Sequence, residues 1–159
     1  MSYSINYNQY MNKIDSRFIV ACQKGEIENI KYCLTSPKLK KHANINVLKD
    51  DGFRYACYFG HLDVVKYLLS SQDLKVHANI DARDNSGLFV ACSEGHLNII
   101  RYLLFDINLK IDSALDIKFK TELDHEKYEI FKDLLNKRDL FFKLNESLIS
   151  RNKNVKIKI

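Results

Sequence analysis

Cysteine and histidine are the residue types in this sequence that could bind a metal ion or form a nucleophile–base pair. They occur at Cys22, Cys33, Cys57 and Cys92 and at His42, His61, His77, His96 and His125. No two cysteines have the Cys-x-x-Cys spacing of a zinc site, and the chain has no glycine-rich phosphate loop and no Gly-x-Ser-x-Gly turn. The sequence therefore predicts no metal site, no cofactor and no enzyme activity.

An internal repeat explains where these residues lie. The stretches 16–34, 51–69 and 86–104 read SRFIVACQKGEIENIKYCL, DGFRYACYFGHLDVVKYLL and SGLFVACSEGHLNIIRYLL, with Ala-Cys and glycine at the same places in each. Catalytic groups are normally unique, so groups that recur every 35 residues indicate structural roles. Helices of stacked units lie about 8–10 Å apart, which is too far for a disulfide between them. We expect buried, reduced thiols and a cytoplasmic protein.

Each repeat predicts two short helices joined by a turn. Apolar residues recur at helical spacing on both sides of the glycine, which is expected to end the first helix. We predict the helix N-caps at Ser16, Asp51, Ser86 and Thr121. A two-helix unit cannot cover its own apolar face, so the units must stack.

The two ends of the chain depart from the repeat. We predict one domain over 1–150, with a capping helix at 1–14, repeats at 15–41, 42–76 and 77–111, a degenerate repeat at 112–136 and a capping helix at 137–150. In the degenerate repeat Thr121 is expected to start a helix with Asp124 at its third position. A last helix beginning near Asp139 is expected to bury Leu140, Phe141, Leu144 and Leu148.

The run GHLDVVKYLL at 60–69 and the segment ANID at 78–81 resemble ankyrin repeats, and the resemblance covers about residues 15–136. Of the family motif T-P-L-H-x-A, only the capping and core positions match, at 51–56 and 86–91. The resemblance implies an all-α ankyrin-repeat solenoid of stacked hairpins. The period exceeds the usual ~33 residues because SSQDLKVH (70–77) adds residues, while residues are missing between Asp84 and Ser86. We therefore expect short loops in place of long β-fingers.

The same resemblance implies a scaffold that binds a partner protein through its concave surface. We expect a monomer, and we expect no membrane insertion because no apolar stretch approaches the ~20 residues that a membrane span needs. These repeats, rich in Ile, Lys and Asn, are similar to those of intracellular bacteria, amoebae and large viruses. A host-directed effector, delivered into a host cell, is therefore one role open to the chain.

The middle repeat differs from its neighbours where a partner would bind. It has Tyr58 and Phe59 where the other units have polar residues, and exposed aromatics are typical of binding hot spots. The alternative is that both rings pack against neighbouring fingers. The predicted partner-binding residues are Leu48, Arg54, Tyr55, Tyr58, Phe59, Arg83, Phe89 and Glu94.

A second functional hypothesis is nucleic-acid binding by a basic loop and tail. Lys38, Lys40 and Lys41 lie in one loop, and 151–159 is a basic tail. The net charge of +5 is a mild bias, so we expect protein binding rather than nucleic-acid binding.

Overall fold

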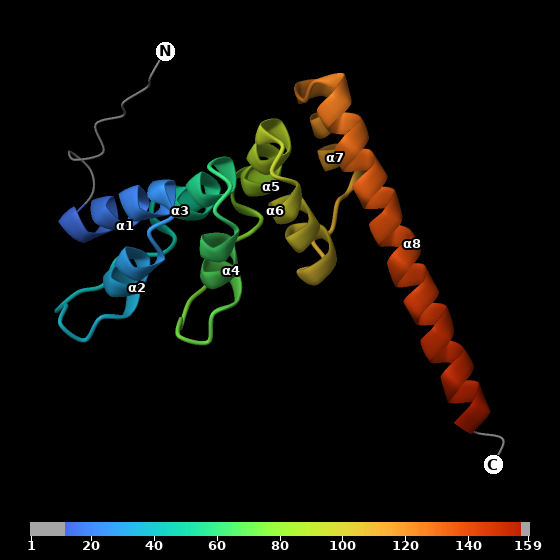
Figure 1. Cartoon of the computed structure of the whole chain (residues 1–159), viewed down its shortest axis with the longest axis horizontal. Coiled ribbons are helices and arrows are strands. Elements are labelled where there is room, and N and C mark those ends of the chain that lie inside the picture. The colour runs from blue at the N-terminus through green and yellow to red at the C-terminus, as the bar shows by residue number, and fades with distance from the viewer. Residues whose placement is uncertain (1–11, 157–159) are drawn as a thin grey trace. The chain divides into compact units, whose positions relative to one another are not determined.

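The computed structural model describes the backbone of residues 12–156 and the side chains of residues 12–150. This part of the chain is helical and contains no strand, so the predicted all-α fold is confirmed (Figure 1). The elements are α1 (Lys13–Lys24), α2 (Ile27–Thr35), α3 (Val47–Tyr58), α4 (Leu62–Ser70), α5 (Ala82–Glu94), α6 (Leu97–Arg101), the π-helical turn η2 (Tyr102–Asp106), α7 (Ser113–Glu122) and α8 (His125–Lys156). Most of the capping helix predicted at 1–14 lies outside the described residues.

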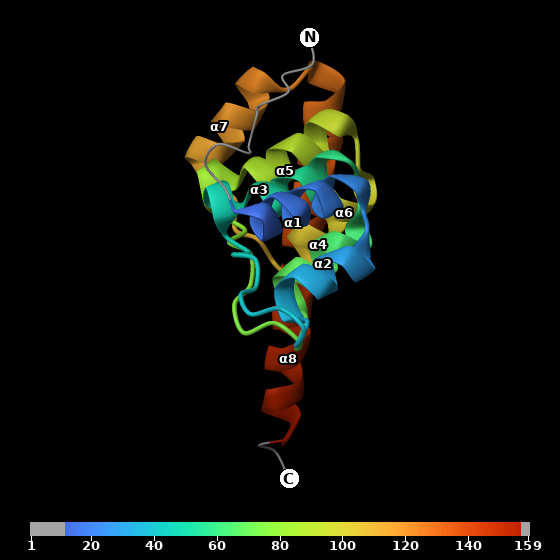
Figure 2. The ribbon, with the colours of Figure 1, turned by 90° about the vertical axis from the view of Figure 1, so that its left-hand side faces the viewer.

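The chain divides into two compact units, Met1–Ile99 and Ile100–Ile159. In the first unit α3 packs between α1 and α5, and Figures 1 and 2 show these three helices side by side in one row, with α2 and α4 in a second row. Within this unit α1 pairs with α2, and α3 pairs with α4. The predicted fold of stacked helix-turn-helix hairpins is therefore confirmed.

The start of α1 is different from the prediction, and its end agrees with it. Asn12, not Ser16, caps α1, because the Asn12 side chain accepts hydrogen bonds from the backbone N–H groups of Ile14 and Asp15. The Ser16 hydroxyl donates to the Asn12 carbonyl from inside the first turn. Gly25, which follows α1, has a φ of 71° and donates its N–H to an α1 carbonyl, which is the left-handed cap that glycine favours.

Three consecutive left-handed residues stand where the fingers are short. They are Leu48 to Asp50 in α3 and Arg83 to Asn85 in α5, with φ between 51° and 64°. The predicted caps Asp51 and Ser86 are wrong, because the break in the helix lies just before them and both residues are already helical. A left-handed residue other than glycine costs about 1–2 kcal/mol, so these turns need tertiary contacts that offset the cost.

A buried aspartate supplies such a contact. Asp50, at the end of the first left-handed turn, is buried, and its Oδ1 accepts hydrogen bonds from Asn46 Nδ2 at 2.6 Å and from the Asn79 N–H at 2.8 Å. One repeat earlier, Asp15 Oδ1 accepts from the Asn44 N–H at 2.7 Å. Each aspartate thus joins the start of a first helix to the next loop of the stack.

Rings and glycines set the spacing between the first helices. A Cβ placed on Gly52 would lie 2.7 Å from Phe18 Cε1, and one placed on Gly87 would lie closer still to Phe53 Cε1. Phe18 and Phe53 are buried and 35 residues apart, as are the two glycines. The ring of each unit therefore lies on a glycine of the next unit, at the position where the family motif has proline.

The four cysteines lie in the core as free thiols. Burial raises the pKa of Cys92 to about 12, and burial raises the pKa values of Cys22 and Cys57 further. A thiol acts as a nucleophile through its thiolate, so at neutral pH these groups stay protonated and unreactive in the folded chain.

In the second unit, Thr121 does not start a helix. It lies in the last turn of α7, where its hydroxyl hydrogen-bonds to the carbonyls of Ile117 and Lys118. Asp112 caps α7 by accepting from the Leu115 N–H, and Asp124 caps α8 by accepting from the Lys127 N–H. The prediction was wrong because it placed Thr121 35 residues after Ser86, whereas the helices of this region do not follow the 35-residue repeat.

The last helix also differs from the prediction. α8 runs without interruption from His125 to Lys156, and its sequence contains neither glycine nor proline to end it. No new helix begins near Asp139, and the four residues predicted to be buried there are at least half exposed, namely Leu140, Phe141, Leu144 and Leu148. The residues of α8 that are buried lie earlier in the helix, from Tyr128 to Arg138.

We predict that Gly87→Ala destabilises the chain by about 1–3 kcal/mol, the usual cost of overpacking. Helix propensity alone would give the opposite sign, a gain of about 0.5–1 kcal/mol, but Phe53 is buried and cannot move aside. Urea unfolding followed by circular dichroism measures the difference. Phe53→Leu, which copies Leu88 of the third unit, should relieve part of the loss in the double variant. A stable Gly87→Ala protein would contradict the contact.

We predict that Cys57→Ser lowers the free energy of unfolding by about 1–3 kcal/mol, because it buries a hydroxyl in an apolar site. Cys57 has no exposed surface. The same unfolding measurement applies, and native-state alkylation of the wild-type chain at pH 7 should be slow at all four cysteines. Rapid labelling of Cys57 in the folded chain would show that its site is open to water.

Candidate partner-binding surface

One face of α3 carries a cluster of aromatic side chains. Tyr55, Tyr58 and Phe59 share this face because residues three and four apart are neighbours on a helix. The rings of Tyr58 and Phe59 meet edge to face with their centroids 4.9 Å apart, and those of Tyr55 and Phe59 are stacked at 6.4 Å. Both geometries are favourable for aromatic pairs, so the three rings hold one another in place.

Arg54 extends the cluster at its N-terminal end. Its guanidinium carbon lies 4.5 Å from the centroid of the Tyr55 ring, and its Nε donates to Asp51 Oδ1 at 2.9 Å. Burial lowers the pKa of Arg54, but the hydrogen bond to Asp51 and the charge of Asp51 more than compensate, so its pKa is raised. A charged guanidinium is therefore fixed over a tyrosine ring.

Asp51 connects this cluster to the left-handed turns. It is buried, and its Oδ1 lies 3.5 Å from a guanidinium nitrogen of Arg83. A second nitrogen of Arg83 donates to the Leu48 carbonyl at 2.9 Å. From the sequence, Asp51 is predicted only as a helix cap, although the spacing of Asp51 and Arg54, three residues apart on a helix, could have indicated their ion pair.

The structure brings together six of the eight predicted residues. A continuous series of contacts runs through Leu48, Arg83, Asp51, Arg54, Tyr55, Phe59 and Tyr58. The other two predicted residues lie on α5, where Phe89 is half-buried and Glu94 is exposed at the end of the helix. We call the seven residues of the series the α3 surface.

The rings at the end of the α3 surface face water. Tyr58 and Phe59 are 39% and 47% exposed, although the alternative hypothesis placed them against neighbouring fingers. Their backbone is held by the next repeat, because the Tyr58 carbonyl accepts a hydrogen bond from His96 Nε2 at 2.8 Å. The rings are thus exposed on a fixed backbone.

The histidines at the turns have structural contacts. His61 Nε2 lies 2.9 Å from the Gln23 carbonyl, and His96 makes the equivalent contact with Tyr58. A carbonyl oxygen only accepts, so both Nε2 atoms carry the proton. A Cβ on Gly25 would lie less than 3 Å from the His61 ring, and a Cβ on Gly60 would lie less than 3 Å from the His96 ring. These contacts join one repeat to the next, whereas the sequence analysis expected structural histidines without naming their partners.

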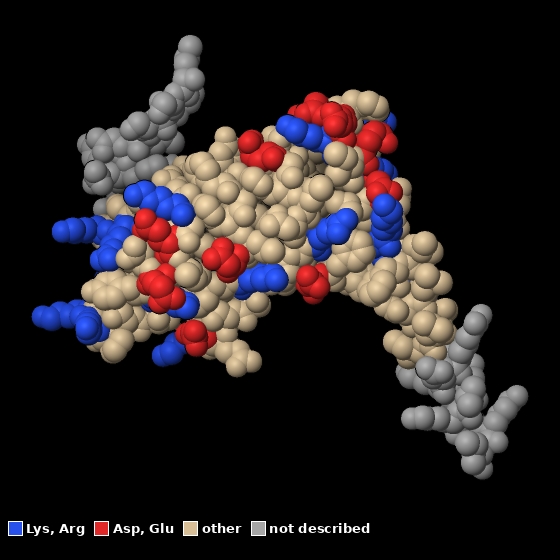
Figure 3. All heavy atoms as spheres, in the orientation of Figure 1, with Lys and Arg blue, Asp and Glu red and all other residues tan. Residues whose placement is uncertain are grey.

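The described side chains include only the loop lysines of the second hypothesis. Lys38, Lys40 and Lys41 are exposed in the loop between α2 and α3, and the side chains of the basic tail are outside the described part. On the face shown in Figure 3, the lysines and arginines alternate with acidic residues instead of forming a stripe. Phosphate backbones are normally bound by such stripes.

The described residues lack two further kinds of feature. No group of three or more His, Cys, Asp or Glu side chains is arranged to hold a metal ion within residues 12–150. Among the helices of the described backbone, none has both the length and the apolar character that a membrane crossing requires.

The repeat is similar to that of a known protein family. A family model for ankyrin repeats in three copies matches residues 18–113. No curated protein sequence and no solved structure matches the chain. The match covers more than half of the chain and extends from within α1 to the start of α7. The chain belongs to the ankyrin-repeat family.

Proposed function

We propose that the chain is a scaffold that binds a partner protein through the α3 surface. Ankyrin repeats are generally protein-interaction modules, and the exposed ring pair of Tyr58 and Phe59 is the observation that carries the proposal. Aromatic and arginine side chains dominate the energy of interfaces, and each can contribute about 2 kcal/mol or more. The α3 surface combines both types.

The contacts within the α3 surface favour binding because they reduce its entropic cost. Immobilising a flexible side chain in an interface costs about 0.5–1.5 kcal/mol. Arg54 is already held by Asp51 and Tyr55, and Phe59 is held between Tyr55 and Tyr58. A partner would therefore meet a surface whose anchors are ordered before it binds.

The flanking charges suggest how a partner is oriented. Lys24 ends α1 on one side of α3, and Glu94 ends α5 on the other side. Both are exposed. A partner with an apolar centre, an acidic group towards α1 and a basic group towards α5 fits this distribution. Such rim charges govern orientation and association rate more than affinity.

We predict that the double variant Tyr58→Ala with Phe59→Ala loses partner capture while its unfolding free energy stays within about 1 kcal/mol of the wild type. Tagged wild-type and variant chains would be compared by pull-down and mass spectrometry. Phe141→Ala is the matched control, because it also removes an exposed ring, from α8, and should leave capture unchanged. A large loss of stability in the double variant would instead assign both rings to the core.

We predict that capture by the α3 surface changes little between about 0.1 and about 0.5 M salt. Binding driven by phosphate contacts falls steeply over such a range because counterions are released, whereas an interface centred on aromatic rings does not depend on them. Repeating the pull-down at both salt concentrations, with and without nuclease, separates the two hypotheses. Capture that disappears at high salt or after nuclease treatment would favour the nucleic-acid alternative.

A further inference from the structure

The residues that lengthen the repeat form two loops of the same construction. In the loop between α2 and α3, His42 Nε2 lies 2.9 Å from the Ser36 carbonyl, and the Ala43 N–H donates to the Cys33 carbonyl. In the loop between α4 and α5, His77 makes the same contact with Ser71 at 2.9 Å, and the Ala78 N–H donates to Leu68. Two hydrogen bonds therefore fix the conformation of each loop.

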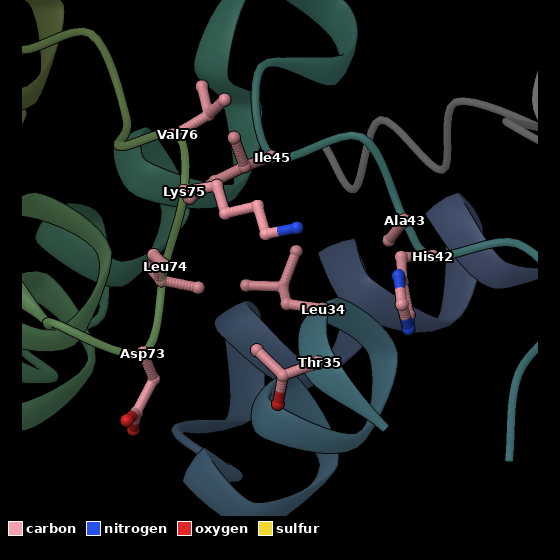
Figure 4. Close-up of a pocket in the computed structure, with 9 residues that line it drawn as sticks. All are labelled: Leu34, Thr35, His42, Ala43, Ile45, Asp73, Leu74, Lys75 and Val76. Atoms are coloured by element: carbon pink, nitrogen blue, oxygen red, sulfur yellow. The ribbon is translucent and has the colours of Figure 1, made fainter. Parts of the chain in front are cut away.

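A pocket of about 410 Å³ lies between these two loops, within the first unit. Its volume is in the range of about 300–1,000 Å³ typical of ligand sites. Its lining includes four aliphatic side chains, namely Leu34, Ile45, Leu74 and Val76. Figure 4 shows them around the opening, with Thr35 and His42 on the side of the first loop. The pocket exists because the loops are longer than the usual repeat allows.

Lys75 supplies the charge of this pocket. In Figure 4 its ammonium extends into the pocket above Leu34, whereas the carboxylate of Asp73 points away. Among the described residues Lys75 has no ion pair and no side-chain hydrogen bond. An unpaired cation above an aliphatic floor complements a ligand that carries a carboxylate beside an aliphatic group.

The two loops share a lysine at one position of this pocket and differ at the next. Lys75 and Val76 of the second loop correspond, 35 residues earlier, to Lys40 and Lys41 of the first loop. Of these four residues, only Lys75 and Val76 line the pocket. Lys40 is therefore a matched control for Lys75, and Lys41 shows which substitution at Val76 the repeat itself accepts.

We propose that this pocket is a second docking site, which takes a segment of a partner protein with an aliphatic side chain next to an Asp or Glu. The aliphatic side chain would fill the space over Leu34 and Ile45, and the carboxylate would pair with the Lys75 ammonium. The site shares no residue with the α3 surface, so it does not depend on the proposed function. A protein segment fits this pocket better than a free metabolite, because Lys75 and Val76 of its wall are exposed to solvent. A segment of a partner that also binds elsewhere on the chain gains from a high effective concentration at such a site.

The test is a titration of the full-length ¹⁵N-labelled chain followed by NMR. The probes are acetyl-Ala-Leu-Glu-Ala-amide and the same peptide with Gln in place of Glu, at millimolar concentrations. We expect localised shifts at the amides of Ala43, Lys75 and Val76, with the Glu peptide bound about two- to fivefold more tightly, as an exposed ion pair allows. Lys75→Gln should abolish the difference between the peptides, whereas Lys40→Gln should leave it intact.

Further variants separate this site from the α3 surface. Val76→Lys, which copies Lys41 of the first loop, should weaken both peptides, and the Tyr58 and Phe59 double variant should weaken neither. Equal binding of the two peptides, or an equal loss in Lys40→Gln and Lys75→Gln, would overturn the role of Lys75. Absence of localised shifts would overturn the site. Binding of N-acetyl-leucine without binding of either peptide would assign the pocket to a small carboxylic acid and refute a protein occupant.

Discussion

The close approach of successive first helices is the constraint on which the first unit depends. Phe18 lies on Gly52 and Phe53 lies on Gly87, at distances that leave no room for a Cβ. The neighbouring Ala56, Cys57, Ala91 and Cys92 are small and buried for the same reason. Because a two-helix hairpin buries its apolar face only against its neighbours, this row of rings and glycines determines where every other element of the unit can lie.

The same spacing explains how the chain tolerates its unusual backbone. Two turns of three left-handed residues would be costly in isolation. They occur where Asp50 receives the Asn79 N–H and where Arg83 reaches back to Asp51 and to the Leu48 carbonyl. These bonds form only when the repeats are stacked at the observed distance. The turns therefore hold the N-terminal end of the α3 surface in a fixed conformation.

Both proposed binding sites arise where the repeat departs from its own pattern. Tyr58 and Phe59 replace polar residues of the other units, and Val76, beside Lys75, stands where the first loop has Lys41. Contacts that recur, such as those of His61 and His96 with the preceding helix, maintain the stack. The scaffold thus comes from repetition, and recognition would come from single substitutions in it.

The sequence by itself determined the helical hairpins, their number up to α5, the glycine-ended first helices and the buried cysteines, because helical periodicity and repetition are local signals. It also predicted that Tyr58 and Phe59 bind a partner, since they break the repeat, and they stay a prediction. Only the tertiary structure decided the left-handed turns and the contacts of Arg83 with Asp51 and Leu48. Those depend on contacts between residues about one repeat apart, such as Asp50 with Asn79 and Leu48 with Arg83, which no local pattern encodes. The helix starts rest on local caps at Asn12, Asp112 and Asp124, which the 35-residue phase of the repeat did not predict. The prediction of two separate helices in place of α8 was wrong. It followed the spacing of the repeat, although no glycine or proline between His125 and Lys156 would end a helix.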